Sequence, residues 1–173
     1  VRQDGKTRRP KTDDPAWKGK LYRALDPKTL GPSEPLTLME MAEPSASHCF
    51  GNNVVSALND QIEPKDSCDH SIPRFTWWDH RGTKEWAQYD LDEPRKVSAV
   101  EVYWFDDTGR GACRVPKSWR VLYRDAGAEF QPVNARGPYG TEKDKFNQIN
   151  FEPVSTSAIK LEVTLEDEWA AGI

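Results

Sequence analysis

From about residue 85 onward, apolar and polar side chains alternate along several short stretches of the chain. In SAIKLEVTLED (157–167), the aliphatic residues fall on one face of an extended strand and the polar residues on the other. Such a strand is buried on one face only, which is typical of an antiparallel sheet. The same period of two recurs in EWAQYDLDEP (85–94), KVSAVEVYWFDD (96–107), SWRVLYRDAG (118–127), EFQPV (129–133) and NQINFEPV (147–154). All of these stretches are predicted to be β-strands.

Turn-forming residues separate the predicted strands. They are Asp92-Glu93-Pro94, Asp107-Thr108-Gly109, Asp125-Ala126-Gly127 and Gly137-Pro138-Tyr139-Gly140. Short strands at this spacing indicate a sandwich or a barrel, and 7 Trp, 13 Pro and 11 Gly in 173 residues suit such a fold better than a helical bundle. We therefore predict an all-β domain, an antiparallel β-sandwich.

Residues 1–42 have a different character. They hold several prolines and many charges and show no sustained period of 2 or 3.6, so we expect a linker or docking arm. The segment WKGKLYRAL (17–25) could pack onto a neighbouring surface. The chain opens without Met and without a visible signal peptide, as expected of a piece cut from a longer protein.

Charge and hydropathy exclude two classes of partner. The formal net charge is −4, and positions 1–24 hold eight Lys or Arg against three Asp, so the rest of the chain is acidic and is not expected to bind nucleic acid. No apolar run approaches the roughly 20 residues that a membrane helix needs. We therefore expect neither a nucleic-acid partner nor membrane insertion.

The three cysteines leave the redox state open. Cys49, Cys68 and Cys113 form no C-x-x-C pair, which argues against a cysteine-based structural zinc site. At most one internal disulfide can form, and Cys49–Cys68 would close the shortest loop. Three free thiols are an equally good interpretation.

Several motifs together resemble the discoidin-like, or coagulation factor V/VIII C-type, family. They are PSASHCFGNNVVSALND (44–60), RFTWWDH (74–80), the strands that begin at Glu85 and Lys96, VPKSWRVLYRDAGAEFQPV (115–133) and FEPVSTSAIKLEVTL (151–165). The resemblance covers roughly residues 43–173 and implies a jelly-roll, galactose-binding-like sandwich. The sequence around FTWWDH and VYWFDDTGRGACRVPKSW is also similar to C-terminal modules of bacterial glycoside hydrolases, especially family 127 β-L-arabinofuranosidases.

Many members of this fold resemble family 32 carbohydrate-binding modules, which bind sugars in loops at one end of the sandwich. Sugar recognition needs an aromatic ring for the apolar face of the sugar and fixed polar groups for its hydroxyls. The loops WWDHRG (77–82) and DDTGRGACR (106–114) carry that mixture, and the resemblance implies that both emerge at the same end. The predicted carbohydrate-binding residues are Trp78, His80, Asp106, Arg110, Arg114 and Trp169.

Simpler roles remain open for these residues. The other tryptophans of the sandwich, Trp77, Trp86, Trp104 and Trp119, are predicted to be core residues. His80 could equally hydrogen-bond the backbone, and Arg110 and Arg114 could pair only with Asp106 or Asp107.

The resemblance also implies a structural calcium ion. Calcium prefers six to eight oxygen ligands, and the family motif corresponds to Asp60, the Thr76 hydroxyl and carbonyls near Ser56 and Ala171. The chain departs from that motif in two ways. Gln61 stands where the family commonly has a glycine able to adopt positive φ, and the chain ends at Ile173, before an acid that often serves as a ligand.

No catalytic constellation is evident. A glycosidase needs two carboxyl groups flanking a cleft, whereas Asp106 and Asp107 are neighbours that point to opposite faces of an extended chain. Ser118 is not part of a G-x-S-x-G motif. The resemblance to glycoside hydrolase modules implies a non-catalytic module that binds plant-type glycan, attached to the catalytic domain of a bacterial glycoside hydrolase in a secreted, periplasmic or cell-surface setting. The alternatives are an accessory domain that packs on the catalytic domain without binding sugar, and part of an active site completed by another domain.

Overall fold

The computed structural model describes residues 2–3, 6–7, 38 and 41–173. The chain divides into two compact units, residues 1–35 and 36–173. In the first unit, β1 (Arg2–Gln3) pairs with β2 (Lys6–Thr7) in antiparallel orientation. Nearly all of the predicted arm, residues 1–42, lies outside the described residues, and so does the segment WKGKLYRAL.

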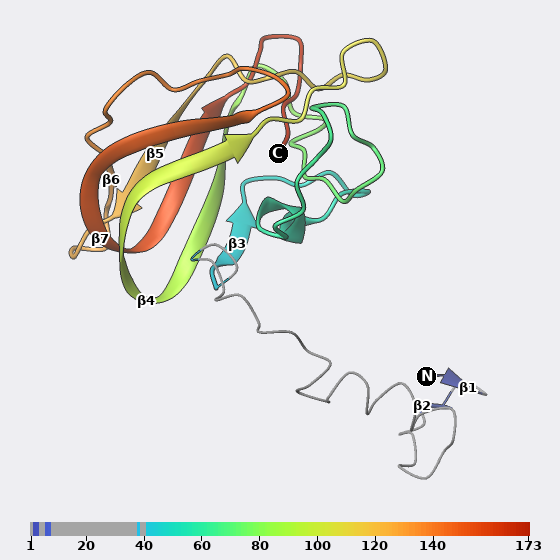
Figure 1. Ribbon diagram of the computed structural model, residues 1–173. Helices are drawn as coiled ribbons and strands as arrows, with labels where there is room; N and C mark the ends of the chain where they lie inside the picture. Colours follow the sequence, from blue (N-terminus) through green and yellow to red (C-terminus); the bar gives the residue numbers. More distant parts are fainter. Residues whose placement is uncertain (1, 4–5, 8–37, 39–40) are drawn as a thin grey trace, which may run out of the picture. The chain divides into compact units, whose positions relative to one another are not determined.

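The second unit is built on one antiparallel sheet with the strand order β3-β4-β7-β5-β6. Its strands are β3 (Glu43–Ala46), β4 (Lys84–Tyr103), β5 (Ser118–Arg124), β6 (Phe130–Pro132) and β7 (Phe146–Thr164), and one 3₁₀ turn, η1, spans Val55–Leu58. Figure 1 shows the long β4 and β7 side by side. The all-β, antiparallel prediction is confirmed. Within the described part of the chain, no helix is long and apolar enough to cross a membrane.

The pair β4–β7 curves so strongly that it supplies both layers of the core. Its register shifts twice, with residues 91–94 opposite residue 157 and residue 98 opposite residues 151–153. Extra residues on one strand of a pair bend it and increase its twist. Inward-facing side chains from both halves of the pair, such as Leu161 and Ile149, then share one hydrophobic core. The predicted turn at Asp92-Glu93-Pro94 is therefore wrong, because the strand bends there and continues.

The core contains three of the four tryptophans that the sequence places there. Trp77 and Trp104 are fully buried and Trp119 nearly so. The indole N–H groups of Trp104 and Trp119 both donate to the Gly140 carbonyl, at 3.2 and 2.7 Å, so burial leaves neither group unpaired.

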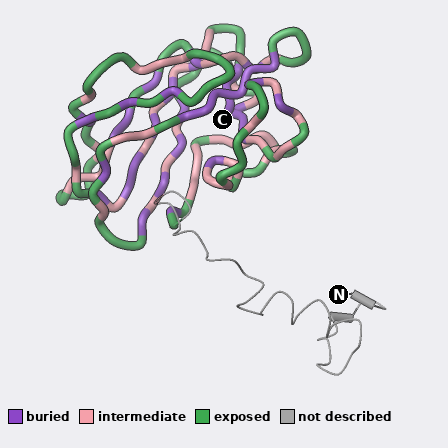
Figure 2. The backbone as a smooth tube through the Cα atoms, viewed as in Figure 1, coloured by how far each residue is buried: buried purple, intermediate pink, exposed green. Residues whose placement is uncertain are grey.

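The core prediction for Trp86 is wrong, because this residue is only half-buried. Figure 2 shows buried and more exposed positions alternating along the strands. In the first half of β4 the buried positions include Glu85, Ala87 and Tyr89, which leaves Trp86 on the other face with the Lys160 ammonium 4.9 Å from its ring centre. A charged residue thus takes an inward position that hydrophobicity alone would give to the tryptophan.

Candidate functional site at the loop end of the sandwich

Three loops meet at one end of the sheet and form a single surface, called here the loop surface: residues 78–83, 105–116 and 166–170. Backbone hydrogen bonds join them, from the Gly82 N–H to the Glu166 carbonyl (2.9 Å) and from the Ala170 N–H to the Ala112 carbonyl (3.0 Å). Beneath them, Phe105, Cys113 and Ala170 form a small apolar cluster on which Trp78 packs. The two loops that the sequence singles out therefore lie together.

Gly172 allows the C-terminal segment to approach this closely. It bridges Thr76 on one side and Phe105 on the other. A Cβ atom at this position would lie 2.5 Å from the Phe75 carbonyl oxygen, which is backbone and cannot move aside easily. A glycine is therefore needed here. It allows the C-terminal segment to lie between the segments that contain Thr76 and Phe105, and so helps to fix the position of Trp169.

Trp169 and Arg114 form the most exposed aromatic feature of the loop surface. Trp169 is 37% exposed, and the guanidinium carbon of Arg114 lies 3.9 Å from the centre of the Trp169 ring. Arg114 Nη1 also donates to the carbonyls of Gly111 (3.2 Å) and Cys113 (2.6 Å) and lies 3.7 Å from Asp107. These contacts fix the guanidinium over the indole, an arrangement favoured by the ring quadrupole.

Trp78 repeats the pairing of an aromatic ring with an arginine. It is half-buried against the apolar cluster, and the exposed Arg81 has its guanidinium carbon 4.7 Å from the ring centre. Arg110 is exposed at the tip of the next loop, and its backbone N–H donates to the Asp107 carbonyl at 2.8 Å. The loop surface thus combines two tryptophan–arginine pairs with a further exposed arginine.

Asp106, by contrast, is buried and its carboxylate holds the loop together. It accepts hydrogen bonds from the Thr108 N–H (3.0 Å), the Thr108 hydroxyl (2.5 Å), the Val115 N–H (3.1 Å) and the Lys143 ammonium (3.3 Å). Burial by itself would raise the pKa of Asp106, but these hydrogen bonds outweigh burial and lower it. The neighbouring Asp107 is also buried and accepts the Cys113 N–H at 2.8 Å.

His80 belongs to a polar network centred on the buried Glu85. Glu85 accepts hydrogen bonds from the Ser47 hydroxyl, the Thr83 hydroxyl (2.6 Å) and His80 Nδ1 (2.7 Å). Burial would raise the pKa of Glu85, and the three hydrogen bonds lower it. The sequence interpretation did not place Glu85 in the interior. The alternation of Ala87, Tyr89 and Leu91 was the signal that could have placed it inward.

Among the predicted calcium ligands, the structure brings Thr76 and Ala171 together. Thr76 lies beside the C-terminal segment, because Trp77 N–H donates to the Ala171 carbonyl at 3.0 Å, and the Thr76 hydroxyl donates to Asn53 Oδ1 at 2.5 Å. Asp60 accepts the Ile62 N–H at 2.9 Å, and the Ser56 carbonyl accepts the Asn59 N–H at 3.3 Å. Gln61 has φ +60°, the conformation for which the family commonly uses glycine. Asp60 is the single carboxylate of the set, so the donors fit calcium weakly.

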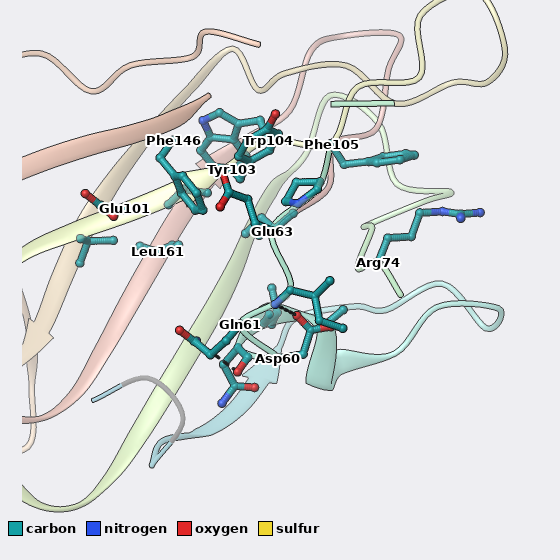
Figure 3. A pocket seen from close by; sticks show the side chains of 18 of the residues that line it. Asp60, Gln61, Glu63, Arg74, Glu101, Tyr103, Trp104, Phe105, Phe146 and Leu161 are labelled. Carbon is teal, nitrogen blue, oxygen red and sulfur yellow. Dashed lines mark hydrogen bonds between the residues drawn. The ribbon is translucent and has the colours of Figure 1, made fainter. Parts of the chain in front are cut away.

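A pocket of about 570 Å³ opens between β4 and the loop of residues 57–74. Figure 3 shows the aromatic side chains of Tyr103, Phe105 and Phe146 on one side of the pocket, with Glu63 beside Tyr103, and Asp60 and Gln61 on the other side. Phe146 (44%) and Ile62 (46%) are exposed. The sequence interpretation did not predict this pocket, because its walls come from segments far apart in the chain.

All three cysteines are free in the structure, which answers the question that the sequence left open. Cys49 and Cys68 are half-buried, and Cys113 is buried in the apolar cluster beneath the loop surface.

Solved structures similar to this chain share its fold. One is of the Streptococcus pneumoniae β-galactosidase BgaA (21% identity, TM-score 0.64, covering 82% of this chain and 93% of that chain). Another is the family 32 carbohydrate-binding module of C. perfringens NanJ in complex with galactose (15%, 0.60, 79% and 91%). A third is chitosan-binding module 1 from a chitosanase/glucanase of Paenibacillus sp. IK-5 (16%, 0.56, 80% and 94%).

Among curated proteins, none matches the chain. The family model of the F5/8 type C domain matches residues 45–173, which include every strand of the sandwich from β4 onward and all of the loop surface. The chain therefore belongs to the F5/8 type C domain family.

Proposed function

We propose that residues 43–173 form a carbohydrate-binding module that binds glycan at the loop surface and catalyses no reaction there. The observation that carries this proposal is the exposed Trp169 with the Arg114 guanidinium stacked on it at 3.9 Å. An indole ring offers a flat apolar platform for a sugar ring. A guanidinium has five N–H donors, so Arg114 can hold its loop and bind a sugar hydroxyl at the same time.

Trp78, Arg81 and Arg110 extend the proposed site. The half-buried Trp78 adds a second aromatic edge, and the exposed Arg81 and Arg110 add hydrogen-bond donors. In this proposal Asp106 contributes indirectly, because its oxygens fix the loop between Phe105 and Val115. The NanJ module in complex with galactose has the same fold, which supports a sugar as the ligand.

The buried carboxylates support a non-catalytic role. A glycosidase acid and base must reach the two sides of a glycosidic bond. Asp106, Asp107 and Glu85 are all buried, and each accepts a hydrogen bond from a residue that lies near it in the chain. None of the three has the exposure that contact with a substrate requires.

We further propose that the module serves a bacterial glycoside hydrolase that acts on plant-type glycan in a secreted, periplasmic or cell-surface setting, with the catalytic domain on the same polypeptide. The similarity of the FTWWDH and VYWFDD segments to glycoside hydrolase modules supports this setting. The Paenibacillus module, which derives from a chitosanase/glucanase, is a parallel case. One shallow site binds weakly, and linkage to a catalytic domain raises its effective concentration near the substrate.

A glycan microarray with wild type and two variants tests the proposal. Trp169→Ala removes the platform, whereas Trp86→Ala is a matched control, since it removes a half-buried tryptophan from the outer face of β4. We expect glycan binding by wild type and Trp86→Ala, and a loss of at least about tenfold in affinity for Trp169→Ala. If Trp169→Ala and Trp86→Ala both bound glycan as tightly as wild type does, the sugar would bind elsewhere.

A second candidate function rests on the exposed Phe146 and Ile62 at the pocket. Exposed apolar side chains beside a pocket are typical of a packing surface, and this observation favours an accessory domain that packs on its catalytic neighbour without binding sugar. In that case Phe146→Ser would weaken the association of the module with the catalytic domain, and no glycan on the array would bind.

A further inference from the structure

Two residues of the loop surface, Asp79 and His80, form a cluster with His48. His48 follows β3, and Asp79 and His80 lie in the loop that precedes β4. One ligand atom from each of the three side chains lies within 4.8 Å of the others. The two imidazoles are stacked, with ring centres 4.0 Å apart and an angle of 14° between the planes.

Each imidazole uses one nitrogen to donate to a fixed acceptor. His48 Nε2 lies 2.7 Å from the Trp78 carbonyl oxygen, which can only accept. His80 Nδ1 lies 2.7 Å from the Glu85 carboxylate. The opposite nitrogens, Nδ1 of His48 and Nε2 of His80, therefore carry the lone pairs when the rings are neutral.

This arrangement is the one that histidine ligands of metals adopt. A metal-binding imidazole usually donates its other N–H to a carboxylate or a backbone carbonyl, which fixes the ring and its tautomer. Here one histidine has the buried Glu85 carboxylate and the other has the Trp78 carbonyl. The exposed Asp79 adds a carboxylate oxygen, which lies within 4.8 Å of a ring nitrogen of each histidine.

We propose that His48, Asp79 and His80 bind a divalent transition-metal ion such as Zn²⁺, with water completing the coordination. Two imidazole nitrogens and a carboxylate oxygen suit zinc, copper or nickel, whereas calcium takes oxygen ligands. The site is therefore distinct from the predicted calcium site, and it does not depend on the proposed carbohydrate function. A bound ion would join the end of β3 to the loop that carries Trp78.

Nuclear magnetic resonance of the histidine ring nitrogens tests the site in the full chain, which has three histidines. Without metal, we expect the Nε2–H tautomer for His48 and the Nδ1–H tautomer for His80. Added Zn²⁺ should shift the ring signals of both and leave His70 unchanged. Zinc that shifts neither ring, or shifts His70 in their place, would overturn the proposal. The proposal would also be overturned if Ca²⁺ shifted the ring signals of His48 and His80 as strongly as Zn²⁺ does.

Conservative variants test the ligands by calorimetric titration with Zn²⁺. His48→Gln keeps an amide that can donate to the Trp78 carbonyl, His80→Asn keeps one that can donate to Glu85, and Asp79→Asn changes an exposed side chain. Each histidine variant therefore keeps its hydrogen bond while it loses the metal-binding atom. We expect each of the three to weaken zinc binding by at least about tenfold, and unchanged affinity in both histidine variants would overturn the proposal.

Two control variants separate the proposed ligands from neighbouring groups that also attract zinc. Asp167→Asn removes an exposed charge from a neighbouring loop and should leave the affinity within about twofold of wild type. Cys49 follows His48 in the chain, and thiolates also bind zinc. Cys49→Ser should bind zinc as wild type does. If Cys49→Ser loses zinc while His80→Asn keeps it, the ligand is the thiol and the proposed site is wrong.

Discussion

The guanidinium carbon of Arg114 lies 3.9 Å from the centre of the Trp169 ring, and the Arg114 backbone N–H donates to the Ala170 carbonyl at 2.8 Å. Two segments more than fifty positions apart are thus joined by both side chain and backbone. The stack fixes the exposed indole in place before any ligand arrives. A pre-organised aromatic side chain loses less entropy on binding, which favours affinity.

Loss of the Arg114 side chain should therefore weaken both the fold and the proposed binding. We expect Arg114→Ala to lower the free energy of unfolding by about 1–2 kcal/mol, because the cation–π contact and the bonds to two carbonyls are lost. Arg114→Lys keeps the charge but not the planar fork and should also weaken glycan binding. Chemical denaturation and calorimetry measure the two effects. Arg136→Ala, at an exposed ion pair with Glu152, should change the unfolding free energy by less than about 0.5 kcal/mol.

Much of the sandwich could be predicted because its strands follow the period of two so closely. Ile159, Leu161 and Val163 are all buried, as the alternation in β7 requires. The bends were not predictable in the same way. Asp92, Glu93 and Pro94 look like a turn locally, and only the partner strand β7 shows that they are extra residues within one continuous strand. Register across a pair is not a local property of either strand.

The candidate site was predictable at the level of loops rather than of individual roles. Asp106 and Arg114 sit in one charged loop, and their sequence neighbours do not reveal that the first is buried and the second stacked on Trp169. His48 and His80 are far apart in the chain and become neighbours through the pairing of β3 with β4. Contacts of this kind depend on tertiary packing, which composition and spacing do not encode.

Cys113 should not react with thiol reagents while the protein is folded. The residue is 4% exposed, and burial, together with the nearby Asp107, raises the pKa of its thiol to about 12. Because the thiolate is the reactive species, alkylation near pH 8 should be very slow. Iodoacetamide labelling followed by peptide mass spectrometry measures this. Rapid labelling of Cys113 without denaturant, at the rate seen in the unfolded chain, would contradict the prediction.

Calcium, if it binds at Asp60 and Thr76, should stabilise the fold modestly. A site with one carboxylate belongs with the weak extracellular calcium sites, whose dissociation constants are about 10⁻⁴–10⁻³ M. At ten times the dissociation constant the gain is about 1.4 kcal/mol, or about 3–6 °C in Tm for a domain of this size. Thermal unfolding with calcium, magnesium or a chelator measures the effect, and Asp60→Asn should abolish it. An identical Tm in all conditions would exclude the site.

Acid should destabilise the loop surface through Asp106. Its folded-state pKa lies below its unfolded value, so its contribution to stability is fully present above about pH 4, near the ordinary aspartate pKa, and is lost as pH falls through the lower folded-state pKa. Asp106→Asn should lower the unfolding free energy at pH 7 by about 1.5–3 kcal/mol, because hydrogen bonds to a charged acceptor are lost. The difference in unfolding free energy between variant and wild type should narrow as the pH falls below about 4, because the Asp106 carboxyl group binds a proton more readily in the unfolded chain than in the folded protein. Urea unfolding at several pH values measures this. The control variant Asp167→Asn changes a side chain that is 81% exposed, and its unfolding free energy should differ from wild type by the same small amount at every pH. If the difference between Asp106→Asn and wild type also stayed constant as the pH fell, the Asp106 carboxylate would not stabilise the loop through its charge.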